Sequence, residues 1–230
     1  RPAREGTRRI SASRAWRSRR LPYLHSFGLT PSNAVVIAHP FTASPVSMLW
    51  SNRGYIDHFA WHPREGTRLV VLNRATGRTR EHVADPFFVF HTVNAFEEDS
   101  ATVLDLLVYP NAEIVTALRV DRLRERLPDL RPSLVRLTLH PAREAASITA
   151  LSDTGFEFPA INYQRVSGRE YRFVWGTSDG QTTEDYASSI VKVDLRGGPT
   201  TSFGDGEHVF GEPVFVGRPQ AALEDDGVLV

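Results

Sequence analysis

The sequence contains no cysteine, which excludes a disulfide framework, a thiolate metal site and a cysteine nucleophile. Any transition metal must therefore be held by histidine and carboxylate side chains. The chain also lacks a surplus of charge, because its 27 basic residues balance its 27 acidic residues. We therefore expect no nucleic-acid partner held by bulk electrostatics. One dense basic cluster lies within residues 8–20, and it predicts either a solvated edge or a contact with phosphate or anionic lipid.

Long apolar runs are absent as well, since none approaches the roughly 20 residues that cross a bilayer. The arginine-rich start does not resemble a signal peptide. We therefore expect a cytoplasmic protein, either soluble or attached peripherally to a membrane. The only methionine is Met48, and residues 226–230 read as the beginning of a strand. These features predict an internal piece of a longer protein in which residues 1–230 form part of one domain, truncated at both ends.

Short apolar segments separated by turn residues dominate the chain, a pattern typical of an antiparallel all-β fold. Hairpins are expected around residues 31–33, 65–66 and 97–100, and a helix is expected over 120–127. His25, His91 and Glu157 follow one another at intervals of 66 residues, and Glu212 follows after 55. Such spacing suits one four-stranded propeller blade plus loops, although the pattern alone favours a propeller over a β-sandwich only narrowly.

His25 and His91 are the histidines whose surroundings suggest a metal site, because each has aromatic and apolar neighbours. A lone histidine in a strand more often satisfies a local hydrogen bond. An apolar setting makes an unpaired imidazole costly, and a carboxylate behind the ring would fix its tautomer. The other histidines are weaker candidates. Those before proline read as architectural (His39, His62, His140), and those beside charged residues or turns are expected to be exposed (His58, His82, His208).

Four segments in a fixed order resemble the carotenoid cleavage oxygenase family. They are His25-Ser26-Phe27-Gly28-Leu29-Thr30-Pro31, Phe90-His91 with Asn94 and Glu97, Phe156-Glu157-Phe158-Pro159 with Ile161-Asn162-Tyr163, and Gly211-Glu212-Pro213 with Glu224-Asp225-Asp226-Gly227. The resemblance implies a seven-bladed β-propeller, of which this chain would be an incomplete arc. It also implies iron(II) held by four histidines with glutamates behind them.

By the same resemblance, His25 and His91 are the second and third metal ligands. Glu157 would accept a hydrogen bond from His91, and Glu212 would serve a histidine further along the chain. The first and fourth histidines, and the glutamate that orients His25, are expected outside this sequence. Strand alternation alone leaves Glu157 open, because a residue between Phe156 and Phe158 points away from both and could equally be exposed.

Tyr23 and Tyr109 are candidates for the wall of a substrate tunnel, and ordinary packing is the alternative for both. Tyr23 lies two residues before His25 and is expected on the same face of its strand. Residues 41–50 resemble in position an apolar loop that dips into a membrane, with burial under a neighbouring loop as the alternative.

The function implied by the resemblance is cleavage of a conjugated C=C bond in a carotenoid or apocarotenoid by a non-haem Fe(2+) dioxygenase, with a lipophilic polyene and O2 as partners. The same iron fold could instead act as a retinyl-ester isomerohydrolase or a stilbene-cleaving dioxygenase. A non-catalytic propeller binding module is a third reading. The 230-residue chain by itself is expected to be inactive, because two metal histidines are missing from it.

Overall fold

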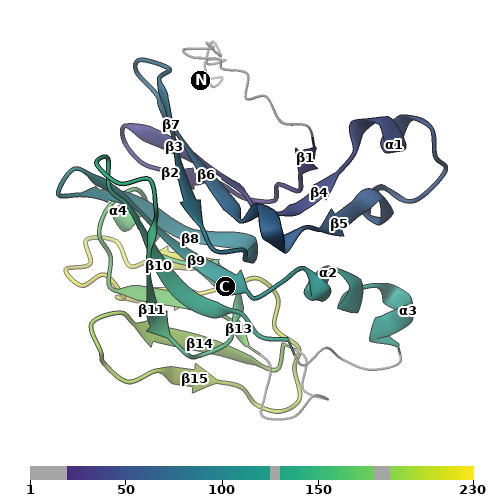
Figure 1. Ribbon diagram of the computed structural model, residues 1–230. Helices are drawn as coiled ribbons and strands as arrows, with labels where there is room; N and C mark the ends of the chain where they lie inside the picture. Colours follow the sequence, from purple (N-terminus) through teal and green to yellow (C-terminus); the bar gives the residue numbers. More distant parts are fainter. Residues whose placement is uncertain (1–19, 125–129, 179–186) are drawn as a thin grey trace, which may run out of the picture.

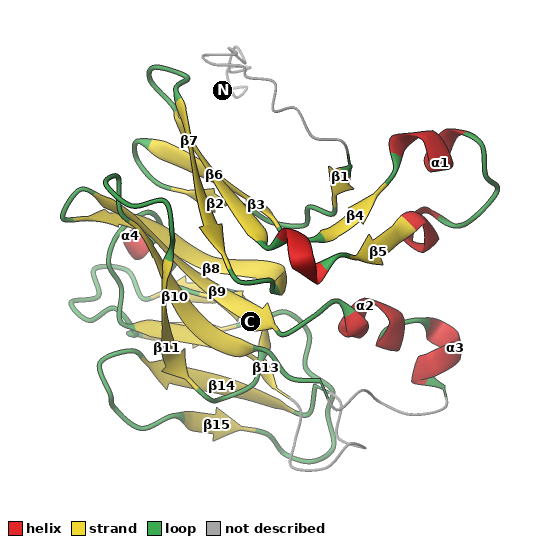
Figure 2. Ribbon diagram, viewed as in Figure 1, coloured by secondary structure: helices red, strands yellow, loops and turns green. Residues whose placement is uncertain are grey.

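The computed structural model describes residues 20–124, 130–178 and 187–230, and it consists almost entirely of antiparallel strands (Figures 1 and 2). Three consecutive four-stranded sheets form its body. The first contains β2 (Gly28–Leu29), β3 (Asn33–Ala38), β6 (Thr67–Asn73) and β7 (Thr79–Ala84). The second contains β8 (Phe88–Glu98), β9 (Ala101–Tyr109), β10 (Ser133–Leu139) and β11 (Ser147–Ser152). The third contains β12 (Glu157–Ala160), β13 (Phe173–Ser178), β14 (Ser189–Asp194) and β15 (Thr201–Phe203).

Smaller elements surround these sheets. A three-stranded sheet consists of β1 (Leu21–Pro22), β4 (Phe41–Ala43) and β5 (Phe59–Trp61), and a two-stranded one of β16 (Phe215–Gly217) and β17 (Gly227–Leu229). The short helices are α1 (Pro45–Leu49), η1 (Tyr55–His58), η2 (Pro63–Glu65), α2 (Glu113–Ala117), α3 (Val120–Leu123) and α4 (Tyr163–Val166). No helix in the described part of the chain is long and apolar enough to cross a membrane.

The second sheet is buried on both faces because it lies between the other two. Leu104 and Leu106 on β9 pack with Val35 and Leu69 of the first sheet, while Val103 belongs to a cluster shared with the third. This explains why β9 is apolar along nearly its whole length instead of alternating. Burial of this apolar area supplies the main driving force that stacks the sheets.

Strands β2, β8 and β12 begin the three sheets, and β8 lies beside both of the others. The interval of 66 residues is therefore one blade, and it returns the chain to the same radial position. His25 precedes β2, His91 lies on β8, and Glu157 begins β12. Gly28 permits the close approach of β2 to the second sheet, because a Cβ there would lie 2.9 Å from Leu104 of β9 and 3.2 Å from Ala95 of β8.

Local expectations were met unevenly. Pro31–Asn33 and Asp99–Ser100 form the predicted turns, but β5 and β6 join different sheets and do not form a hairpin around 65–66. In the predicted helical range 120–127, the structure has the short helix α3, and residues 125–127 lie outside the described part of the chain. Residues 8–19 of the basic cluster also lie outside it.

Candidate metal centre

His91 is held at an irregular point of β8. Phe90 and His91 have no Cα partner in β9, because the register passes from Val89 opposite Val108 to Thr92 opposite Leu106. This bulge leaves backbone groups that the ladder does not use. Ser26 satisfies them: its hydroxyl donates to the Phe90 carbonyl oxygen at 2.7 Å and accepts from the Thr92 amide at 2.9 Å. The segment that carries His25 is thus fastened on both sides of His91.

His25 lies in a bend between β1 and β2, where the sequence pattern predicts a strand. Its ring centroid is 5.0 Å from that of His91, with the two planes at 83°. Burial and the neighbouring His91 lower the pKa of His25, so its ring is neutral at pH 7. The Tyr23 hydroxyl lies 3.4 Å from His25 Nδ1, which leaves Nε2 as the nitrogen without a protein partner.

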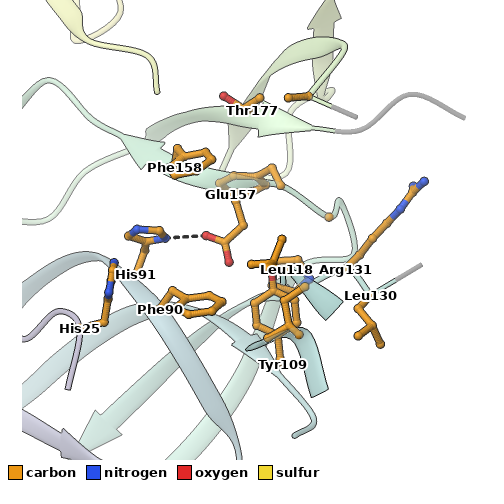
Figure 3. A pocket seen from close by; sticks show the side chains of 15 residues that line it. His25, Phe90, His91, Tyr109, Leu118, Leu130, Arg131, Glu157, Phe158 and Thr177 are labelled. Atoms are coloured by element: carbon orange, nitrogen blue, oxygen red, sulfur yellow. Dashed lines mark hydrogen bonds and ion pairs between the residues drawn. The ribbon is translucent and has the colours of Figure 1, made fainter. Parts of the chain in front are cut away.

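Glu157 faces His91, with Oε2 2.6 Å from the ring Nδ1 (Figure 3). Both side chains are mostly buried, at 19% and 22% exposure. Because Nδ1 is engaged by the carboxylate, the Nε2 atom of His91 is available to a metal. The other carboxylate oxygen, Oε1, is buried with no hydrogen-bond partner among the described residues. The geometry therefore combines two imidazoles with a mostly buried carboxylate that forms no ion pair with a described arginine or lysine.

Phe158 explains how Glu157 comes to face inward. Its φ of +53° places a bulky residue in the left-handed region, and the register of β12 with β13 shifts between Glu157 and Ala160. As a result Phe158 does not share the face of Phe156, which is buried in the core. The Phe158 ring instead lies 5.5 Å from His91. Gly176 on β13 makes room for this bulge, since a Cβ there would lie 2.7 Å from the Glu157 carbonyl oxygen.

We expect Phe158→Gly to be more stable to urea than Phe158→Ala, by about 1 kcal/mol. Both substitutions remove the ring contact with His91, but only glycine adopts a positive φ without a steric cost. The midpoints of urea unfolding of the two variants, measured side by side, test this. Equal midpoints would show that the backbone at residue 158 is not strained.

A cavity of about 240 Å³ opens beside these residues. Its wall is mostly apolar and is formed by His25, Phe90, His91, Tyr109, Ile114, Leu118, Leu130, Arg131, Pro132, Gly155, Phe156, Glu157, Phe158, Thr177 and Ala187. Tyr109 is in the wall, as the sequence suggests. Tyr23 is not; it lies behind His25 and packs against Phe41, Phe59 and Phe88. Its place in a substrate tunnel stays a prediction, and in this structure it is a neighbour of His25.

Two polar residues on β8 connect neighbouring blades. Asn94 donates to the carbonyl oxygens of Val166 and Arg169 and accepts from the Gly168 amide, so it holds the loop that follows β12. Glu97 accepts from Ser32 and neighbouring donors in the turn after β2. The family-like pattern His91, Asn94, Glu97 thus fixes β8 against both adjacent blades, a role that spacing alone did not suggest.

Glu212 is exposed and precedes β16, in the wall of a different cavity that it shares with Trp175 and Lys192. The structure does not bring it to His25 and His91. His82, which we expected to be exposed, is 1% exposed, because its side chain points between the first and second sheets. His39 is also buried, and burial lowers its pKa to about 4.

The described residues fit part of a metal site. Two imidazoles at this separation can ligate one ion, and Glu157 provides the carboxylate that supports one of them. Nitrogen donors without thiolates suit iron, copper or zinc. No group of three or more histidine, cysteine, aspartate or glutamate side chains placed to hold a metal occurs among the described residues. Further ligands would have to come from elsewhere.

Known proteins resemble this chain in sequence. Residues 3–230 match the family described as retinal pigment epithelial membrane protein (RPE65). The chain is 30% identical over 222 residues to a carotenoid isomerooxygenase of Galleria mellonella, and 32% identical over 211 residues to an apocarotenoid-15,15'-oxygenase of Synechocystis sp.. Each match covers 90% of this chain and 43% of the relative, so the chain spans less than half of their length.

Solved structures give the same result. A cobalt-substituted Synechocystis apocarotenoid oxygenase superposes with a TM-score of 0.78 at 30% identity, covering 90% of this chain and 44% of that one. The three stacked sheets are therefore consecutive blades of a β-propeller, and the described residues form an open arc of it. The relatives include mitochondrial and chloroplastic proteins. From the family match and the shared fold, this chain belongs to the RPE65/carotenoid cleavage oxygenase family.

Proposed function

We propose that the whole protein is a non-haem iron(II) dioxygenase that cleaves one conjugated C=C bond of a carotenoid or apocarotenoid. One O2 adds one oxygen atom to each carbon of the broken bond, giving two carbonyl products without an external reductant. The observation that carries the proposal is the group His25, His91 and Glu157 at one side of an apolar cavity. Iron(II), when bound, supplies a redox centre that can activate dioxygen.

The chain's own residues contribute orientation and a dry site. His25 and His91 present unprotonated nitrogens, and Glu157 holds the His91 ring and offsets positive charge. Phe90, Tyr109 and other apolar side chains of the wall exclude water and offer surfaces to a polyene. Burial raises the pKa of Tyr23, so its hydroxyl stays protonated beside His25. No side chain needs to act as an acid, base or nucleophile.

Turnover by the whole protein tests this function. We expect iron(II)-reconstituted protein to convert an apocarotenoid into two carbonyl products, with one atom from 18O2 in each. Retinyl-ester isomerohydrolysis would give a retinol without dioxygen uptake, and stilbene cleavage would give aromatic aldehydes. Product analysis with all three substrates separates these reactions. Absence of turnover with every substrate, in protein that holds iron, would favour the binding module.

Iron binding by the 230-residue chain alone should be weak, because the described residues bring only two imidazoles together. We expect substoichiometric iron after dialysis, measured by inductively coupled plasma mass spectrometry beside the whole protein. Apolar side chains at its edge, including Val228 and Phe203, are 60% and 66% exposed, so self-association is also expected in light scattering. A monodisperse monomer with one tightly held iron would contradict both expectations.

Peripheral membrane contact is a further part of the proposal. Within residues 41–50, β4 is buried, but Leu49 and Trp50 at the end of α1 are 81% and 86% exposed. No described part of this chain covers these two side chains. Clustered exposed apolar side chains suit insertion into the interfacial layer of a bilayer.

We expect the double substitution Leu49→Ser with Trp50→Ser to weaken vesicle binding about tenfold or more, since each side chain loses apolar area worth about 1.5–3 kcal/mol when buried. Flotation with phosphatidylcholine vesicles measures this. Val120→Ser is a suitable control, because Val120 is 65% exposed on a different helix. Unchanged flotation of the double variant would remove residues 41–50 from the membrane contact.

A further inference from the structure

A second cleft, of about 430 Å³, lies between the first and second sheets and shares no wall residue with the cavity at His91. One wall is the face of β6 and β7 that bears Val71 and Arg80, with Arg78 just before β7 and Asn33 of β3 beside them. The other wall consists of Ser100 and Thr102 at the start of β9 and Leu139 and Pro141 at the end of β10. Apolar side chains such as Leu69 and Leu137 pack the two sheets together, and the cleft begins where polar side chains replace them.

The charge of this cleft is one-sided. Arg78 immediately precedes β7 and Arg80 lies on it, and both line the cleft. No aspartate or glutamate belongs to its described wall. Both arginines are exposed, and neither guanidinium forms a hydrogen bond or ion pair with a described side chain. By contrast, Glu81, the residue after Arg80, faces the opposite side of β7 and pairs with Arg68. The two cations therefore remain available to an anion.

The floor of the cleft has unused polar capacity as well. His82 lies there, 1% exposed, and its Nδ1 has no hydrogen-bond partner among the described residues. The wall residue Asn33 donates a hydrogen bond to the carboxylate of Glu97 at 3.2 Å. The oxygens of this carboxylate also accept hydrogen bonds from Thr30 and Ser32. Hydroxyl groups of Ser100 and Thr79 add neutral donors to the wall.

We propose that this cleft binds a phosphate monoester group. Paired guanidinium groups suit a tetrahedral dianion, to which they donate several charge-assisted hydrogen bonds at once. The volume exceeds that of a phosphate, and Val71, Leu139 and Pro141 offer an apolar surface to the group that the phosphate carries. The ligand is either a small soluble phosphomonoester or the headgroup of a lipid such as phosphatidic acid.

Phenyl phosphate, titrated into the protein by calorimetry, is the direct probe, with phenol as its uncharged counterpart. We expect a Kd of about 1 mM or tighter for phenyl phosphate and no measurable heat with phenol. The double substitution Arg78→Gln with Arg80→Gln should weaken binding at least tenfold. Arg53→Gln with Arg64→Gln carries the same change of net charge at exposed positions outside the cleft, and it should bind as the unchanged protein does.

Vesicles with and without phosphatidic acid form the second arm. Binding of phenyl phosphate that depends on Arg78 and Arg80 assigns the cleft to a soluble ligand. Binding of phosphatidic acid vesicles alone, with the same dependence, assigns it to a lipid headgroup, and both results support the site. The proposal is overturned if neither probe binds, or if the control pair of substitutions weakens binding as much as the pair in the cleft.

Discussion

His91→Ala in the whole protein should abolish both iron binding and turnover. The substitution removes the nitrogen ligand and leaves Glu157 as a mostly buried carboxylate without its hydrogen-bond partner. An uncompensated buried charge is costly, so we expect the Glu157 carboxylate to be protonated or hydrated in this variant. Iron content by mass spectrometry and product formation with an apocarotenoid are the two measurements. We expect a loss of at least about 100-fold in each.

His208→Ala is the matched control, because His208 is exposed and contacts only the nearby Asp205. Circular dichroism and urea unfolding of both variants separate a missing ligand from a failure to fold. A folded His91→Ala protein that keeps one iron per chain would show that His91 is not a ligand. The family assignment would stand in that case, since it rests on the whole sequence and fold.

Glu157→Gln should leave the fold intact while lowering iron occupancy or activity about 10–100-fold, the usual scale for a group that supports a metal ligand. Glutamine has nearly the same shape, and its amide oxygen can still accept from His91 Nδ1 at a similar distance. It lacks the negative charge that makes the imidazole more basic and balances the cation. The expected change is therefore in affinity and rate, with little change in stability.

Glu170→Gln provides the comparison for this variant. Glu170 pairs with Arg196 at the surface, where both side chains are more than 60% exposed, so the same chemical change there should be silent. Iron dissociation followed with a chelator, and kcat measured at saturating iron, distinguish weaker binding from slower chemistry. If Glu157→Gln and Glu170→Gln have the same rate of iron dissociation and the same kcat, Glu157 does not support the metal ligand and has only a structural role.

The sequence by itself indicated an antiparallel all-β fold and an interval of 66 residues, and its resemblance to a known family made His25, His91 and Glu157 the candidate site residues. His25, His91 and Glu157 recur at one-blade intervals, and the turns at Pro31 and Asp99–Ser100 are local signals that need no tertiary context. The absence of cysteine limited the donors to imidazole and carboxylate. These features depend on residue type and spacing, which the chain carries explicitly.

Only the tertiary structure decided the direction of the side chains. Simple alternation could not say whether Glu157 faces inward, because the answer depends on the left-handed backbone at Phe158 and on the space left by Gly176. The burial of His82 was missed for a related reason: its surroundings come from strands distant in sequence. Alternation along a strand shows which side chains share a face, but it does not show which face meets the core. A bulge or a neighbouring sheet can therefore change which face is buried without changing the local sequence pattern.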